Sequence, residues 1–301
     1  MIQSYSINRV AYKARLILQL SKIRISQLVA ISTMLGYVMA TGRFSYEMIL
    51  PIVGTFLLSC GSAALNQVQE HAFDARMYRT RNRPIPSGKM TFSEALGISL
   101  FLMVLGSVML YVGANSMALL LGLFNILWYN GLYTPLKRVS SFAIFPGALI
   151  GAIPPMIGWV AGGRGLMEIP ILSIAFFFFI WQVPHYWLLL SNLNEDYRRA
   201  GYPTLTSHFP KPQFAKITFT WIVATATWGV LLAFFADRHS LPLISLLFIS
   251  GTWLVWSSRS LLKKRLQDTE FREAFKNINY YMVMVILVMI VDRVTSLYTI
   301  G

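Results

Sequence analysis

Nine long apolar segments constrain the fold of this chain more than any other feature of its sequence. Each has 18 to 21 residues, enough for an α-helix to cross the hydrocarbon core of a bilayer. With 55% hydrophobic and 13% charged residues, the 301-residue chain also has too little polar surface for a soluble globule. The sequence therefore predicts an all-α, single-domain integral membrane bundle over residues 1–301, with about nine transmembrane helices around a central cavity. The segments are 25–42, 48–66, 93–112, 116–133, 141–161, 167–187, 217–236, 241–258 and 278–297.

The distribution of basic residues predicts how this bundle lies in the membrane. If alternate connections lie on opposite sides, 22 of the 26 lysines and arginines fall on one face, and the other face keeps Arg43, Arg164, Arg238 and Arg293. The positive-inside rule then predicts a multi-pass protein of the cell inner (cytoplasmic) membrane, with residues 1–24 as a cytosolic N-terminal tail. The basic, acid-free first 22 residues leave a mitochondrial inner membrane as the alternative. Because topology and the lipid bilayer explain the net charge of +14, no nucleic-acid partner is expected.

A polar segment begins at the end of the second apolar segment and continues past it. Asn66, Glu70 and Asp74 recur every four residues, so they share one face if the helix continues through them. Two carboxylates at this spacing repel each other, and a divalent cation would turn that repulsion into coordination. Oxygen ligands at a site open to water and phosphate suit Mg²⁺. The segment thus predicts a metal-bridged diphosphate site, with diphosphate donors among Arg76, Arg79, Arg81, Arg83 and Lys89.

A second polar segment follows the sixth apolar segment and repeats this arrangement. The apolar helix ends with the run 181–187, which contains His185. Polar and charged residues then follow within twelve positions, namely Asn192, Asn194, Glu195, Asp196, Arg198 and Arg199. Ionisable groups at membrane depth normally face a cavity or the interior of the bundle. We therefore expect the two polar segments to face one shared cavity.

The order of these motifs along the chain resembles that in the UbiA superfamily of intramembrane prenyltransferases. That superfamily has a first motif N-x-x-x-D-x-x-x-D and a second acidic motif after the sixth helix. Within it, the chain is most similar to the protohaem IX farnesyltransferase (haem O synthase) branch, through Arg-Thr-x-x-Arg-Pro at 79–84, Tyr-Thr-x-x-Lys-Arg at 133–138 and Pro-His-x-Trp at 184–187. The chain departs from the family pattern at Glu70, where the family has Asp, and at Ala200, where the wider superfamily has a further acid.

The resemblance implies an enzyme, a prenyltransferase that transfers the farnesyl group of farnesyl diphosphate to a vinyl group of haem b (protohaem IX) and so gives haem O. It implies Mg²⁺ as cofactor, with Asn66, Glu70, Asp74 and Asp196 as catalytic residues and metal ligands. Tyr133 would shield the allylic cation with its ring face. The implied diphosphate-binding residues are Arg79, Arg83, Lys137, Arg138 and Arg199, and the implied haem-binding residues are His185 and His71. A haem A synthase or a terminal oxidase is the implied assembly partner.

Several alternatives remain open at this point. The row from Asn66 to Asp74 also fits a solvated helix end, and the loop arginines also fit a purely topological signal. His185 either donates a hydrogen bond to a backbone carbonyl freed by the preceding proline, or it contacts haem as an axial ligand or propionate partner. A related enzyme would prenylate a quinone precursor or another aromatic acceptor. A transporter and a non-catalytic assembly factor are the hypotheses from other classes of protein. A transporter would require charges at the helix centres, whereas here the charges gather on one face of the membrane.

Overall fold

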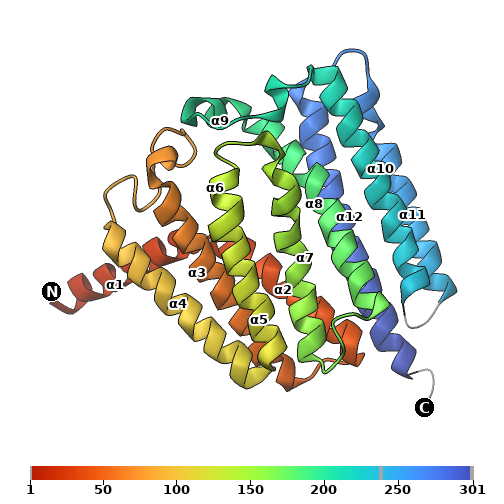
Figure 1. Cartoon of the computed structure of the whole chain (residues 1–301), viewed down its shortest axis with the longest axis horizontal. Coiled ribbons are helices and arrows are strands. Elements are labelled where there is room, and N and C mark those ends of the chain that lie inside the picture. The colour runs from red at the N-terminus through yellow and green to blue at the C-terminus, as the bar shows by residue number, and fades with distance from the viewer. Residues whose placement is uncertain (1, 237–239, 299–301) are drawn as a thin grey trace.

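The computed structural model describes residues 2–236 and 240–298, and the regular elements in these ranges are helical (Figure 1). Nine helical segments within the described part of the chain are long and apolar enough to cross a membrane. This confirms the predicted all-α membrane bundle. Arg238 lies outside the described residues. The nine segments are Ile23–Thr41, Tyr46–Asp74, Phe92–Gly113, Ser116–Leu136, Ser141–Ala161, Ile169–Asn192, Lys211–Phe235, Leu241–Leu262 and Asp268–Ser296.

Individual helices extend beyond their apolar parts. The second membrane helix continues from its apolar part to Asp74, and the seventh and ninth helices of the predicted set begin earlier than their hydropathy suggests, at Lys211 and Asp268. The polar end turns continue the backbone hydrogen bonding of the helix outside the apolar span. The elements that matter below are α1 (Ile2–Leu20), α2 (Ile23–Thr41), α3 (Ile49–Asp74), α4 (Phe92–Gly113), α6 (Thr134–Leu136), α7 (Ile144–Ala161), α8 (Ile169–Asn192), α9 (Asn194–Ala200), α10 (Lys211–Phe235), α11 (Leu241–Ser258) and α12 (Asp268–Tyr298).

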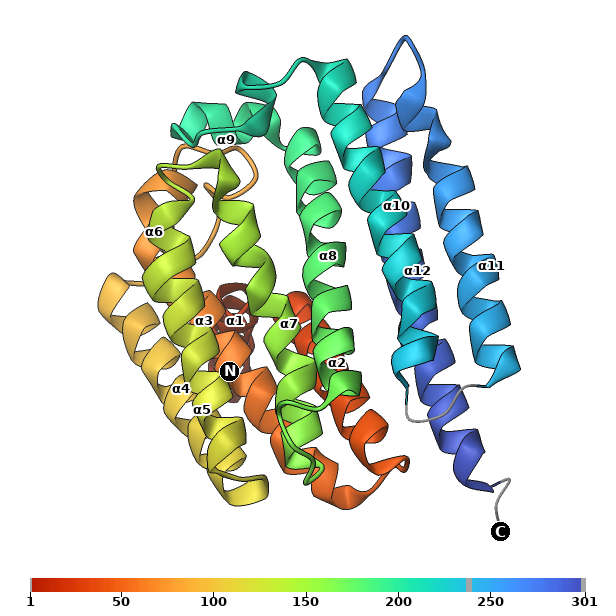
Figure 2. The same ribbon diagram turned by 45° about the vertical axis from the view of Figure 1, so that its right-hand side comes forward.

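The long helices stand side by side and pack mainly on their sequence neighbours (Figures 1 and 2). Helix α3 packs on α4 and α2, α2 on α7, α7 on α8, and α8 on α10. Helix α12 contacts α2, α8 and α11, so it links the C-terminal helices to the N-terminal ones. The connections after α3, α6 and α9 gather at one end of the bundle, at the top in Figure 1, where α9 lies across the helix ends.

Close backbone contact between α2 and α7 holds the centre of the bundle together. A Cβ atom built on Gly36 would lie 1.8 Å from the Pro155 carbonyl oxygen, and one on Gly158 would lie 1.8 Å from the Thr33 carbonyl oxygen. Glycine is required at both positions because no side chain fits between the two backbones. Such contacts between small residues are typical of helix pairs in membranes. Pro154 and Pro155 lie inside α7, and at Pro155 the carbonyl makes this packing contact.

Helix α1 precedes the membrane-spanning part and extends away from the bundle at its N-terminal end (Figure 1). Its C-terminal residues Leu16 and Leu20 are buried against Ala64, Val68 and Ala95. The end of the predicted N-terminal tail is therefore packed on α3 and α4. This contact positions the junction between α1 and α2, which contributes to the site described next.

Candidate active site

The polar end of α3 forms a buried row of ligand atoms. Asn66, Glu70 and Asp74 are exposed by only 1%, 4% and 1%, although two of them are carboxylic acids. They share one face because α3 continues through Asp74, as their four-residue spacing predicts. We call these three residues the ligand row. Burial of two carboxylates requires compensating charge or hydrogen bonds.

A different cation contacts each member of the ligand row. Two of these cations come later in the chain than the ligand row, one in the loop after α3 and one after α6. The third comes before it, at the junction of α1 and α2. The pairs are Lys22 Nζ with Asn66 Oδ1 at 2.8 Å, Lys137 Nζ with Glu70 Oε2 at 2.6 Å, and Arg83 Nη1 with Asp74 Oδ2 at 2.6 Å. Three cations therefore meet two carboxylates and one amide in a small volume.

Glu70 has three side-chain partners, and they contact both of its oxygens. Besides Lys137, the Asn66 Nδ2 donates to its Oε2 at 2.9 Å, and the Tyr202 hydroxyl donates to its Oε1 at 2.7 Å. Asn66 Nδ2 also donates to Thr134 Oγ1 at 3.1 Å, which ties α3 to α6. Both oxygens of Glu70 are therefore held in place by donors from three separate parts of the chain.

The electrostatics of the site favour an incoming anion. Burial, together with the nearby Arg83 and Lys137, lowers the pKa of Lys22 to about 7. Burial also lowers the pKa of Lys137, and the Glu70 carboxylate opposes that shift. Burial and Glu70 raise the pKa of Tyr202, so its hydroxyl remains a hydrogen-bond donor. The lysines are crowded by like charge, and a bound anion would relieve this repulsion.

The second polar segment lies directly against the loop that follows α3. The carboxylate of Asp196 in α9 accepts hydrogen bonds from the backbone N–H of Tyr78 at 3.1 Å and of Arg79 at 3.2 Å. Just after α9, Tyr202 reaches Glu70 and packs in a small cluster with Met77. The structure therefore brings the two polar segments together at one end of the bundle. Asp196 contacts the backbone of this loop.

Two of the three remaining predicted diphosphate residues, Arg138 and Arg199, lie on aromatic side chains at the rim of this region. The guanidinium of Arg199 lies 4.3 Å from the ring centroid of Tyr78, and that of Arg138 lies 5.0 Å from the ring centroid of Phe73. Arg138 also donates from Nη2 to the backbone oxygen of Gln69 at 2.8 Å. Arg79 contributes its backbone N–H to Asp196, and its side chain is exposed. These arginines surround the ligand row without pairing with it.

Tyr133 lies beside the ligand row at the end of a π-helical turn, Leu127–Tyr133. Its ring stacks on Tyr129 with centroids 5.8 Å apart, and Lys137 Nζ lies 5.5 Å from its ring centroid. A Cβ atom on Gly147 would lie 2.6 Å from Tyr133 Cε2, so the absence of a side chain at this position of α7 leaves room for the ring. The face of this ring is thus oriented so that it can stabilise positive charge.

The two predicted haem-contacting histidines differ in their surroundings. The ring of His185 lies between those of Trp181 and Phe275, with centroid distances of 4.6 Å and 5.1 Å. Its Nδ1 is buried and has no hydrogen-bond partner among the described residues, so Nδ1 does not make the proposed bond to a freed backbone group. His71 is exposed, and its Nδ1 lies 2.9 Å from the Val68 oxygen, beside the ring of Phe92.

Three residues of the site were not predicted from the sequence: Lys22, Thr134 and Tyr202. The sequence indicates Lys22 only as one of many basic residues that set the topology. Its backbone has φ 46°, and it is the one described non-glycine residue with positive φ. Such strained conformations are concentrated at functional sites, but they are invisible in a sequence. Thr134 lies within the string at 133–138 that carried the family resemblance, and Tyr202 lies within a further matching string, Ala-Gly-Tyr-Pro at 200–203. These strings are the signal that could have identified both residues.

The donor atoms of the ligand row fit a magnesium ion. They are carboxylate and amide oxygens on one helix face, and Glu70 is oriented by further hydrogen bonds. Among residues 2–236 and 240–298, no three His, Cys, Asp or Glu side chains converge as one metal cage. Mg²⁺ usually binds through one or two carboxylates and keeps oxygens of water or phosphate.

Comparison with known proteins places this site in a family. A profile of the UbiA prenyltransferase family matches residues 29–279. The protoheme IX farnesyltransferase of Oleidesulfovibrio alaskensis is 31% identical over 277 residues, which are 92% of this chain and 96% of that protein. The human mitochondrial protoheme IX farnesyltransferase is 38% identical over 193 residues, 64% of this chain and 43% of that protein.

Two solved structures share the fold. A structure described as digeranylgeranylglyceryl phosphate synthase in membranes has a TM-score of 0.77 at 18% identity, covering 94% of this chain and 99% of that one. A UbiA homologue from Archaeoglobus fulgidus, bound to DMAPP and Mg²⁺, has a TM-score of 0.72 at 14% identity, covering 93% and 99%. The fold and the site thus define an intramembrane prenyltransferase. The chain belongs to the UbiA prenyltransferase family.

Proposed function

We propose that this chain transfers the farnesyl group of farnesyl diphosphate to a vinyl group of protohaem IX and so produces haem O. The observation that carries the transferase chemistry is the buried ligand row, in which each member is contacted by its own cation. The choice of donor and acceptor is supported by the relatives named protoheme IX farnesyltransferase, one of which aligns with 92% of this chain.

The residues of the site suggest how the reaction proceeds. Lys22, Lys137 and Arg83 would pass from the ligand row to the diphosphate oxygens when the substrate enters, and Asn66, Glu70 and Asp74 would then be free to hold Mg²⁺. Bound Mg²⁺ would neutralise the charge that grows on the departing diphosphate. The side-chain cations nearest the diphosphate would also stabilise the departing group, because C–O cleavage leaves negative charge on it. Arg79, Arg138 and Arg199 at the rim would attract the diphosphate from the aqueous side.

C–O cleavage also leaves an allylic cation on the prenyl chain. We assign Tyr133 to its stabilisation, because the ring is fixed between Tyr129 and Gly147 and already faces the ammonium of Lys137. Asp196 would act by holding the loop after α3 in place, and it becomes a metal ligand only if that loop moves. The vinyl group of haem then forms the new C–C bond with the farnesyl cation, which leaves the positive charge on the haem side chain. Water adds to that carbon and loses a proton, and this gives the hydroxyethylfarnesyl group of haem O.

His185 is the residue that we propose to contact haem. Its Nδ1 is buried without a partner in the described structure, and its ring lies among aromatic side chains that suit a macrocycle. A haem titration monitored by absorbance should show a shifted Soret band for the wild type and a weaker shift for His185→Ala. An identical titration for both proteins would remove His185 from the haem site. His71 lies on the exposed side of α3 and is a weaker candidate.

A direct assay tests the proposed reaction. Purified protein in detergent is incubated with Mg²⁺, farnesyl diphosphate and haem b, and the haem fraction is analysed by mass spectrometry. We expect farnesylated haem from the wild type and from Asp268→Asn, a matched control that removes an exposed carboxylate paired with Lys211, away from the ligand row. Glu70→Gln and Asp74→Asn, or addition of EDTA, should abolish the product.

The same assay separates the proposal from its alternative. A parallel reaction offers an aromatic quinone precursor in place of haem b. Prenylation of the aromatic compound with none on haem would identify a different UbiA-type acceptor. No product from any donor and acceptor pair, with a folded sample, would refute the transferase proposal.

We also propose that the protein lies in the bacterial cytoplasmic membrane with its N-terminus in the cytosol. The proposal rests on the strong excess of lysine and arginine in the connections at the end of the bundle that carries the site. Reporter fusions at the N-terminus and in the connection 162–168 should report opposite sides of the membrane. The reverse pattern would overturn this orientation.

A further inference from the structure

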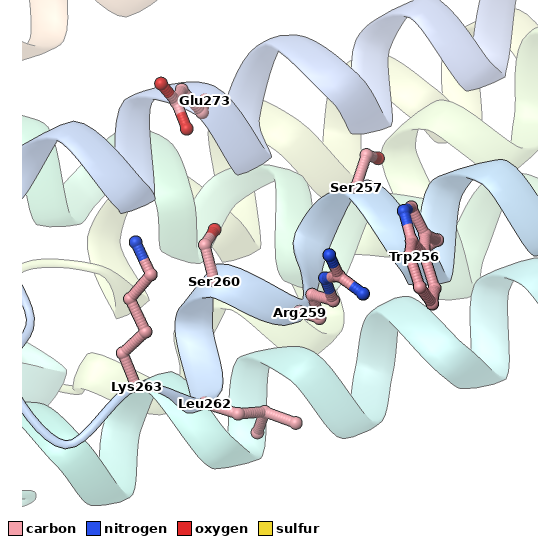
Figure 3. Close-up of a pocket in the computed structure, with 7 residues that line it drawn as sticks. All are labelled: Trp256, Ser257, Arg259, Ser260, Leu262, Lys263 and Glu273. Atoms are coloured by element: carbon pink, nitrogen blue, oxygen red, sulfur yellow. The ribbon is translucent and has the colours of Figure 1, made fainter.

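A polar pocket lies at the same end of the bundle as the candidate active site, but beside the C-terminal helices α11 and α12 (Figure 1). It has a volume of about 570 Å³ and lies at the end of α11, between the short helix Arg259–Leu262 and α12. Figure 3 shows the side chains that line it, namely Trp256, Ser257, Arg259, Ser260, Leu262, Lys263 and Glu273. The pocket opens at the level where the apolar part of α11 ends, so it faces the boundary between lipid and water.

Three polar groups of this pocket lack protein partners. The guanidinium of Arg259 lies 3.5 Å from the ring centroid of the exposed Trp256, and none of its N–H groups has an acceptor among the described residues. The hydroxyl of Ser260 is buried and has no hydrogen-bond partner there. Within the described residues, the exposed carboxylate of Glu273 has no cation or donor either. Lys263, by contrast, already pairs with Glu270 at 3.2 Å.

The unpaired groups are complementary to a molecule that carries both charges. Arg259 supplies N–H donors in the geometry that binds phosphate. Glu273 lies on α12, across the pocket from Ser260 and Lys263, whose polar ends point toward that helix (Figure 3). A carboxylate at this position would repel a ligand that is only anionic, whereas it would pair with an ammonium group. Trp256 beside Arg259 is typical of side chains that lie among lipid headgroups.

We propose that this pocket binds the phosphoethanolamine headgroup of a membrane phospholipid. The phosphate contacts the guanidinium of Arg259, the ammonium contacts Glu273, and the acyl chains follow the apolar surface of α11. A glycerol headgroup lacks the cation for Glu273. A choline headgroup has a cation without N–H donors. Phosphatidylethanolamine therefore supplies a partner to both unpaired charged groups of the pocket.

Lipid competition measured by native mass spectrometry tests this site. Protein purified in detergent is mixed with equal amounts of phosphatidylethanolamine, phosphatidylglycerol and phosphatidylcholine that have the same acyl chains. We expect the wild type to retain phosphatidylethanolamine over each of the others by roughly threefold to fivefold, the effect of one partly exposed charge pair. Glu273→Gln should remove this preference, and Arg259→Gln should reduce the retention of all three lipids. Arg265→Gln is the matched control, since it removes an exposed cation of the same loop that does not line the pocket.

Each outcome decides the proposal. A preference that is lost in Glu273→Gln and kept in Arg265→Gln supports it, provided the melting temperatures of the variants are unchanged. Equal retention of the three lipids, or a wild-type preference for phosphatidylglycerol, overturns it. Inorganic phosphate at millimolar concentration is added in a separate arm. Displacement of the lipid by phosphate alone would indicate a simple anion site and would also overturn the proposal.

Discussion

Replacing Lys137 with methionine should destabilise the metal-free protein and increase the stabilisation that Mg²⁺ provides. The Nζ of Lys137 lies 2.6 Å from Glu70 Oε2, and Glu70 is only 4% exposed, so the variant leaves a buried carboxylate without its cation. Breaking a fully buried pair costs about 3–5 kcal/mol. Here Glu70 keeps the donors of Asn66 and Tyr202, and the Lys137 side chain is 17% exposed. We therefore expect a smaller loss, about 2 kcal/mol.

Thermal unfolding in detergent measures this effect. A loss of about 2 kcal/mol corresponds to a decrease in Tm of roughly 4–8 °C. The measurement is made in EDTA and again in Mg²⁺, where bound metal should replace the missing charge and narrow the gap to the wild type. Lys216→Met is the control, because that lysine is exposed and has no acidic partner among the described residues. Its effect should stay within about 0.5 kcal/mol.

Two results would refute this reasoning. If Lys137→Met were as stable as the wild type in EDTA, Lys137 would not compensate the negative charge of the Glu70 carboxylate. If Mg²⁺ raised the Tm of both proteins by the same amount, the metal would not bind where Lys137 lies. The control separates either result from a general effect of removing a cation from this end of the bundle.

Further substitutions probe the other parts of the site and the fold. Lys22→Met should lower kcat/KM roughly tenfold to a hundredfold in the haem farnesylation assay, the range of one charge-assisted hydrogen bond, and arginine at this position should restore most of the activity. Gly36→Ala should destabilise the protein by about 1–3 kcal/mol in thermal unfolding, because its Cβ would overlap the Pro155 carbonyl. Gly97→Ala, where nothing lies within 4 Å of the added Cβ, should instead stabilise it by about 0.5–1 kcal/mol. Asp196→Ala should free two backbone N–H groups, and the loop after α3 should then be cut faster in limited proteolysis.

The sequence predicted the parts of this protein that depend on local pattern. A segment that crosses lipid alone must be helical, because a helix satisfies its own backbone hydrogen bonds there. A long apolar segment therefore identifies a membrane helix from its hydropathy. The four-residue spacing of Asn66, Glu70 and Asp74 gives a shared face because helix geometry is fixed by short-range contacts. The helix ends were less predictable, since the polar turns at Lys211 and Asp268 are helical without being apolar.

The partners of the ligand row could not be predicted in the same way. Tyr202 reaches Glu70 across 132 positions of sequence, and Lys22 reaches Asn66 across 44. Such contacts depend on how α1, α3 and α9 pack, and no local pattern encodes that packing. The family resemblance helps only where a motif already surrounds the residue, as it does for Tyr202 but not for Lys22.

The charge balance of the site constrains the order in which its ligands bind. Glu70 and Asp74 carry two negative charges, whereas Lys22, Lys137 and Arg83 carry three positive ones, so the site has a net positive charge when all are ionised. A divalent cation that arrives alone must displace these side chains into a region with no anion to receive them, and it adds to their repulsion. A diphosphate ester supplies the acceptors that the displaced lysines and arginine require. Metal and diphosphate should therefore bind cooperatively, each raising the affinity for the other by the same factor. The cations on the ligand row then keep the two buried carboxylates neutralised between reaction cycles.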